Sequence, residues 1–143
     1  MSRESKIIEV ENKRDSKDLI REYEAFGWEL LSINDKEIAF TRETQNKVYA
    51  DLIKFEYQYE ALREDLYQLK KPIAPKKINA STAFILILLL IIPGILYIVV
   101  KTKQNKKYKE ELAAYEAEYD RIKKQIKKVC DDSRGVFFGQ QNQ

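Results

Sequence analysis

The chain has 143 residues, the size of one domain or of a small domain with appendages. Its 26 basic and 23 acidic residues leave a formal net charge of +3, too even a balance to predict nucleic-acid binding. It has no histidine and one cysteine, which excludes an intrachain disulfide, a Cys/His zinc site and histidine-dependent catalysis. We therefore expect no catalytic, cofactor-binding or metal-binding residues, no cofactor, and an inert thiol at Cys130.

Residues 1–43 are expected to form a small α+β head in the order strand, helix, strand, strand. The segment KIIEVEN alternates apolar and polar residues, which is typical of a strand. Ser16 is placed to cap a helix that ends at Gly27. WELLSI and EIAFTRE then predict two strands joined by a turn at Asn34-Asp35. A unit of about 40 residues is marginally stable alone, so we expect Trp28 to be buried in the head or against the next helix.

The head resembles a family of small bacterial domains of uncharacterised function. The resemblance covers residues 6–43 and rests on a helix followed by FGWELLSI and a strand that closes on FTRE. It implies a fold and a bacterial origin but no chemistry. The matched positions are Gly27, Trp28, Glu29, Leu30, Phe40 and Arg42.

Two segments with heptad spacing follow, residues 44–73 and 101–133, which we call the first arm and the second arm. In both, apolar residues recur at alternating intervals of four and three, which predicts a coiled coil or paired helices. Pro72 and Pro75 are expected to end the first arm and to open a linker at 74–79. The positions expected to pack are Leu52, Phe55, Tyr59, Leu62, Leu66, Leu112, Tyr115, Tyr119, Ile122 and Ile126.

The partner of each arm is left open by the heptads. Each arm could pair with its own copy in a homodimer, or lie as an amphipathic helix on lipid or on the head. Alternatively the two arms pair antiparallel, in layers whose residue numbers sum to 181, such as Leu52 with Val129 and Leu62 with Tyr119. The arm carboxylates, such as Glu56, are expected on solvated helix faces. Residues 134–143 are expected to form a tail after a helix that ends near Asp131-Asp132.

Between the arms, residues 80–100 carry no charge and are almost wholly apolar. About 20 such residues in a helix cross the roughly 30 Å of hydrocarbon in a bilayer. The composition therefore predicts a transmembrane helix over 80–100. The residues expected at the membrane interface are Lys76, Lys77, Phe84, Tyr97, Lys101 and Lys103.

Two topologies fit this apolar segment. A single-pass helix would tolerate Pro93-Gly94 as a kink, whereas in a re-entrant hairpin the same pair would be the turn. The positive-inside rule does not choose an orientation, because residues 63–79 and 101–109 each carry five basic side chains. We expect the single-pass arrangement first and keep the hairpin as the alternative.

The fold class expected is thus an α+β head joined to long α-helices with coiled-coil heptads and one transmembrane helix. The function expected is that of a non-enzymatic bacterial membrane-anchored interaction or scaffold protein that oligomerises through its arms. The alternative is a monotopic hairpin protein that binds or shapes lipid, with both arms in the cytoplasm. We expect it in the inner (plasma) membrane with the head cytoplasmic. The expected partners are the bilayer and a second copy or another membrane protein, and not nucleic acid.

Overall fold

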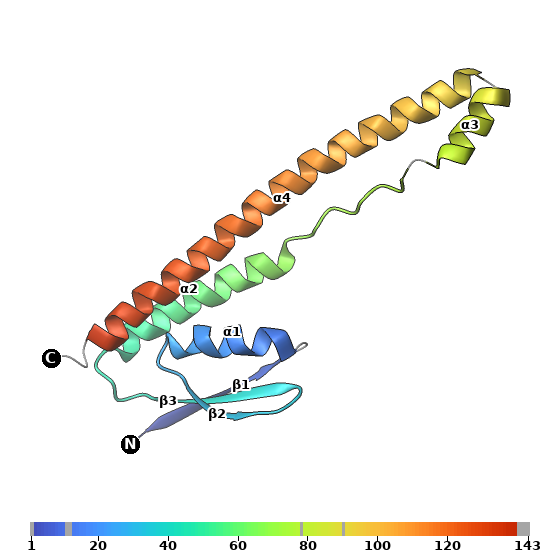
Figure 1. The fold of residues 1–143 in the computed structure, drawn as a ribbon. Helices are drawn as coiled ribbons and strands as arrows, with labels where there is room; N and C mark the ends of the chain where they lie inside the picture. Colours follow the sequence, from blue (N-terminus) through green and yellow to red (C-terminus); the bar gives the residue numbers. More distant parts are fainter. Residues whose placement is uncertain (1, 11–12, 78, 90, 140–143) are drawn as a thin grey trace. The chain divides into compact units, whose positions relative to one another are not determined.

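A computed structural model describes residues 2–10, 13–77, 79–89 and 91–139. In chain order its elements are β1 (Arg3–Glu9), α1 (Lys13–Glu24), β2 (Glu29–Ile33), β3 (Glu37–Glu43), α2 (Tyr49–Gln68), α3 (Ala80–Leu89) and α4 (Ile91–Gly139), labelled in Figure 1. The chain divides into two compact units. The first, which we call the head unit, combines residues 1–66 with 122–143, and the second comprises residues 67–121.

The sheet of the head unit is antiparallel, with the order β1-β3-β2. Lys6 pairs with Phe40 and Ile8 pairs with Ile38, so that alternate side chains of β1 and β3 share one face. β2 is an edge strand whose register against β3 shifts between Leu30 and Ser32, and all five of its residues are exposed. The predicted order strand, helix, strand, strand and the α+β class are therefore confirmed.

Two local features shape the connections between elements of the head unit. The Asn34 side-chain oxygen accepts hydrogen bonds from the backbone N–H groups of Lys36 and Glu37, at 2.9 and 2.7 Å, which closes the predicted turn between β2 and β3. Gly27 has a φ of +79° after the end of α1, a conformation that favours glycine.

The predicted cap at Ser16 is wrong, because α1 already begins at Lys13 and Ser16 is buried inside it.

The core of the head unit is aromatic and is built by α1, α2, the sheet and the last part of α4. The Tyr23 ring stacks on Phe40 at 5.3 Å between centroids and meets Tyr59 edge-on at 5.5 Å. Phe26 and Tyr59 are fully buried beside them. Trp28 is buried in the same cluster, as predicted, and so are Ile122, Ile126 and Cys130 of α4.

The end of α4 also bonds to the end of α1. The Ser133 hydroxyl donates to the carbonyl of Ala25 at 2.8 Å, and Arg134 donates to the carbonyl of Arg21 at 2.8 Å. Carbonyls at a helix C-terminus lack partners within their own helix, so these two side chains supply what α1 lacks. The last turns of α4 therefore complete the head, although more than 100 residues separate them from α1.

The helices differ from their predicted limits at four places, the first being that α2 begins at Tyr49 rather than near residue 44. α2 ends at Gln68 rather than at Ile73, since Pro72 disfavours helical backbone at the residue before it. α4 joins the second half of the apolar segment to the second arm in one helix. α4 also continues past Asp131-Asp132, so the helix end predicted there is wrong. The helix continues because residues as far as Phe137 pack on the head.

The apolar segment 80–100 is divided between α3 and the first ten residues of α4, and residue 90 lies outside the described residues. Among the helices described, none is both long enough and apolar enough to span a bilayer. Pro93 and Gly94 are helical, so the turn that the hairpin alternative placed at this pair is wrong. Pro93 is tolerated in the first turn of α4 because the N–H groups there have no partner within the helix.

Candidate functional site

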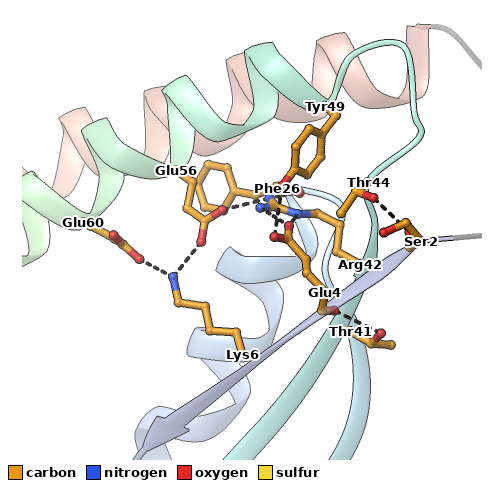
Figure 2. A network of polar contacts seen from close by, with 10 residues as sticks. All are labelled: Ser2, Glu4, Lys6, Phe26, Thr41, Arg42, Thr44, Tyr49, Glu56 and Glu60. Carbon is orange, nitrogen blue, oxygen red and sulfur yellow. Dashed lines mark hydrogen bonds and ion pairs between the residues drawn. The ribbon is translucent and has the colours of Figure 1, made fainter.

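A network of charges centred on the buried side chains of Arg42 and Glu56 joins the sheet to α2 in the head unit (Figure 2). Arg42 of β3 is at its centre, with a side chain only 5% exposed. Its guanidinium lies 2.7 Å from an oxygen of Glu4 and 2.8 Å from an oxygen of Glu56, and it donates to the carbonyl of Phe26 at 2.9 Å. Its Cζ also lies 4.2 Å from the ring centroid of Trp28. Arg42 is thus held by two carboxylates, a backbone carbonyl and an aromatic face.

The second cation of the network is Lys6 of β1. Its ammonium donates to Glu56 at 2.6 Å and also to Glu60, so Glu56 bridges Lys6 and Arg42 as Figure 2 shows. Burial alone would lower the pKa of Lys6, but the hydrogen bonds from its ammonium to the two carboxylates outweigh burial and raise that pKa. The two cations, Lys6 and Arg42, face three carboxylates, those of Glu4, Glu56 and Glu60, so the cluster has a net charge of −1.

This network corrects one expectation and explains part of a resemblance. Glu56 is buried rather than on a solvated helix face, because β1 and β3 place two cations opposite it. Four of the positions that carry the resemblance have structural roles in the head. Gly27 adopts the left-handed turn after α1, and Phe40 fills the core. Trp28 stacks on Arg42, and Arg42 anchors the network. The sequence did contain a signal for this network. Glu4, Lys6 and Ile8 occupy alternate positions along β1, which places all three side chains on the face of the sheet that points to the core.

A shallow cavity of about 380 Å³ in the head unit contains Cys130, lined by residues of α1 and α4. Burial raises the pKa of the Cys130 thiol to about 11, and the neighbouring charge of Glu22 contributes to the rise. A thiol with such a pKa is protonated near neutral pH and is a poor nucleophile. The raised pKa therefore agrees with the expectation that the Cys130 thiol is inert.

The arm residues fall into two groups. Leu52, Tyr59, Ile122 and Ile126 are buried in the head unit, and Phe55, Leu62 and Leu66 pack partly buried against its core. Leu112 and Tyr115 of the second unit are half-buried and Tyr119 is exposed, with the two tyrosine rings stacked at 6.1 Å. The first group thus finds its partners within the chain, and coiled-coil pairing of the second group stays a prediction.

The register of the arms within the head unit differs from the layers predicted. Side-chain atoms of Leu52 and Phe137 both lie within 3.3 Å of the position that a Cβ atom on Gly27 would occupy. Leu52 is therefore close to Phe137, whereas the predicted layers paired it with Val129. Leu62 and Val129 line one cavity together. These pairs have residue numbers that sum to 189 and 191, so the observed pairing is displaced by eight to ten residues, or about 12–15 Å along a helix, from layers that sum to 181. A heptad pattern shows which face of a helix packs but does not specify how far two helices are shifted along each other.

The second unit carries exposed apolar side chains on both of its described apolar helical segments, although Leu31 and Ile33 of the head are exposed too. In α3, Phe84 is 65% exposed and Leu88 is 68% exposed, whereas the large apolar residues at the centre of the head are fully buried. Along α4 the exposed apolar positions are Ile95, Leu96, Ile98, Val99 and Val100, and Tyr97 is half-buried. Of the predicted interface lysines, Lys76, Lys77 and Lys103 are exposed and Lys101 is half-buried. Large exposed apolar surfaces are typical of sites that contact lipid or protein.

The two flanks of this apolar surface run beside each other within the second unit. Leu69, Lys70 and Pro72, which precede α3, line one cavity together with Glu111, Ala114, Tyr115 and Glu118 of α4. The chain therefore leaves and returns at the same end of the unit.

Comparisons of the chain with protein-family models, with curated proteins and with solved structures found no match. The bacterial family that the head resembles stays a prediction that rests on the six residues named for it.

Proposed function

We propose that this is a non-enzymatic membrane-bound interaction protein whose apolar segment enters the bilayer from one side and returns to the same side. The carrying observation is the shared core of the head unit, in which residues 1–66 and 122–139 pack together. These two parts flank the apolar segment in the chain. A segment that crossed the bilayer once would separate them, whereas a hairpin keeps both in the same compartment.

Two further observations support the hairpin. Leu69 and Pro72 before the segment line a cavity with Ala114 and Tyr115 after it, which requires both flanks on one side. The limb formed by α3 has ten residues, and Ile91–Val100 of α4 gives a second limb of equal length. Each is about 15 Å long, half of the roughly 30 Å of bilayer hydrocarbon. Such limbs suit insertion into one leaflet.

The hairpin also accounts for the even distribution of basic residues. The positive-inside rule places lysine-rich flanks in the cytoplasm. With both flanks in one compartment, the five basic residues in 63–79 and the five in 101–109 no longer conflict. We therefore propose the cytoplasmic face of a bacterial inner membrane as the location, with the head unit in the cytoplasm.

The partners proposed are the bilayer itself and a protein bound at the membrane surface. Interaction rather than catalysis is supported by the absence of histidine from the sequence and by the protonated Cys130 thiol. Leu112, Tyr115 and Tyr119 remain outside the head core, so self-association through this part of α4 remains part of the proposal.

Cysteine labelling tests the topology. In a Cys130→Ser background, Lys36→Cys in the head turn and Gln104→Cys after the apolar segment each introduce one exposed thiol. Both should react with a membrane-impermeant maleimide in inside-out vesicles and neither in intact spheroplasts. Leu88→Cys is the control, and it should be protected from both sides. Labelling of the two exposed positions from opposite sides would refute the hairpin, and release of the protein by alkaline carbonate would refute membrane insertion.

A further inference from the structure

The sequence around the apolar segment is free of acidic residues. Between Asp65 and Glu110 there is no aspartate or glutamate, and every charged residue is a lysine. With a net charge of +3 for the whole chain and +9 for this stretch, the remainder carries 3 − 9 = −6. The lysine collar, as we call this set, consists of Lys70, Lys71, Lys76, Lys77, Lys101, Lys103, Lys106, Lys107 and Lys109.

We propose that the lysine collar binds the anionic headgroups of phospholipids and makes the protein selective for anionic leaflets. This inference rests on the proposed hairpin, which brings the two halves of the collar to one membrane surface. The whole collar belongs to the second unit, and Lys70 lines a cavity with α4 residues that follow Lys109. The flanks before and after the apolar segment therefore act on the same leaflet.

The arrangement of the α4 lysines suits a helix that passes through the headgroup layer. At 100° per residue, the α4 lysines of the collar point in directions spread over about 240° of the helix circumference. A helix lying flat on lipid would instead concentrate its lysines on one side. Lys101, Lys103 and Lys106 lie within about 9 Å of Val100 along the axis, roughly one Debye length from it, and Lys107 and Lys109 lie within about 14 Å.

Few carboxylates of the chain compete for these charges. Among the described residues, the ion pair formed by a collar lysine is that of Lys107 with Glu111, at 3.6 Å between two exposed side chains. Exposed pairs of this kind are weak and are screened by salt. Lys76, Lys77, Lys103, Lys106 and Lys109 are exposed, so their ammonium groups are available to phosphate oxygens. Because apolar side chains adjoin them, lipid phosphate is favoured over the phosphates of a nucleic acid.

Vesicle flotation of the purified full-length protein tests the proposal. We expect binding to vesicles that contain phosphatidylglycerol to exceed binding to pure phosphatidylcholine vesicles, and the excess to fall as salt is raised. The triple variant Lys103→Gln, Lys106→Gln, Lys109→Gln should lower the affinity for anionic vesicles by on the order of a hundredfold. The matched control Lys124→Gln, Lys127→Gln, Lys128→Gln removes the same charge from exposed positions of α4 in the head unit and should retain the wild-type affinity.

Each other outcome has one meaning. Equal binding to both vesicle types would overturn the lysine collar and leave membrane insertion standing, whereas flotation with neither would overturn the proposed function as well. An equal loss in the control variant would attribute the preference to net charge and overturn the collar. Release from anionic vesicles by a duplex DNA oligomer at constant salt would reassign the lysines to nucleic acid.

Discussion

Replacing Glu56 by glutamine removes the one carboxylate that bridges both buried cations of the head. The side chains of Glu56 and Arg42 are 9% and 5% exposed, so water screens their interaction little. The glutamine amide would keep the volume of the carboxylate but not its charge. Arg42 and Lys6 would then each face one carboxylate in place of two.

Removing one partner of a buried ion pair costs about 3–5 kcal/mol, because the other charge stays buried without compensation. Here Arg42 keeps Glu4 at 2.7 Å and Lys6 keeps Glu60, so we expect the lower end, about 3 kcal/mol. Glu60→Gln is the matched control. Its side chain is 39% exposed and pairs with Lys6, so its replacement should cost about 0–1 kcal/mol.

Urea unfolding of the detergent-solubilised protein measures both variants. Trp28 is the only tryptophan and lies 4.2 Å from the Arg42 guanidinium, so its fluorescence reports on the network directly. The midpoint should fall markedly for Glu56→Gln and little for Glu60→Gln, with unchanged slopes. If the two variants lose the same free energy of unfolding, the buried network does not stabilise the junction of the sheet and α2, and the reasoning is refuted.

Two more predictions concern the same unit. Gly27→Ala should cost about 1–3 kcal/mol of unfolding free energy, because φ is +79° and the new Cβ would lie 3.2 Å from Phe137 and 3.3 Å from Leu52. In a Phe137→Ala background the same change should cost less by urea unfolding, and an unchanged cost would contradict the contact with α4. Folding raises the pKa of Lys6 above its usual value of 10.5. The stabilisation by Lys6 is therefore fully present below pH 10.5 and is lost as the pH rises through the pKa of the folded state. Wild type should therefore lose its stability advantage over Lys6→Met in alkaline urea titrations above about pH 10.5, and a constant difference would refute this.

The local structure of the head was predictable because its signals are short-range. Gly27 after an amphipathic helix, Asn34 between two alternating segments and a lone Trp28 each indicate their structure within a few residues. The charge network was not predictable in this way. Glu56 resembles any exposed helix carboxylate until β1 and β3 place Lys6 and Arg42 against it.

The arms show a different limit. Some heptad positions, such as Tyr59 and Ile126, are buried in the head, but so are Glu56, Cys130 and Ser133, which the predicted positions do not include. The alignment was wrong because it depends on where Phe137 meets the turn at Gly27, a contact between residues 110 positions apart. The exposed apolar positions and lysines of the second unit lie where composition placed them, and membrane insertion itself remains a proposal.

Because the last turns of α4 complete the head, the order of synthesis constrains how the protein matures. The ribosome produces α1, the sheet and α2 first, but Ser133 bonds to Ala25 across 108 residues of chain. Closing so long a loop is entropically costly and slow compared with local contacts. The apolar segment is synthesised during this interval, before the head is finished. A chain cut short before Ser133 would keep its aromatic core open to chaperones and proteases, so the head becomes stable only once the last turns of α4 have been made.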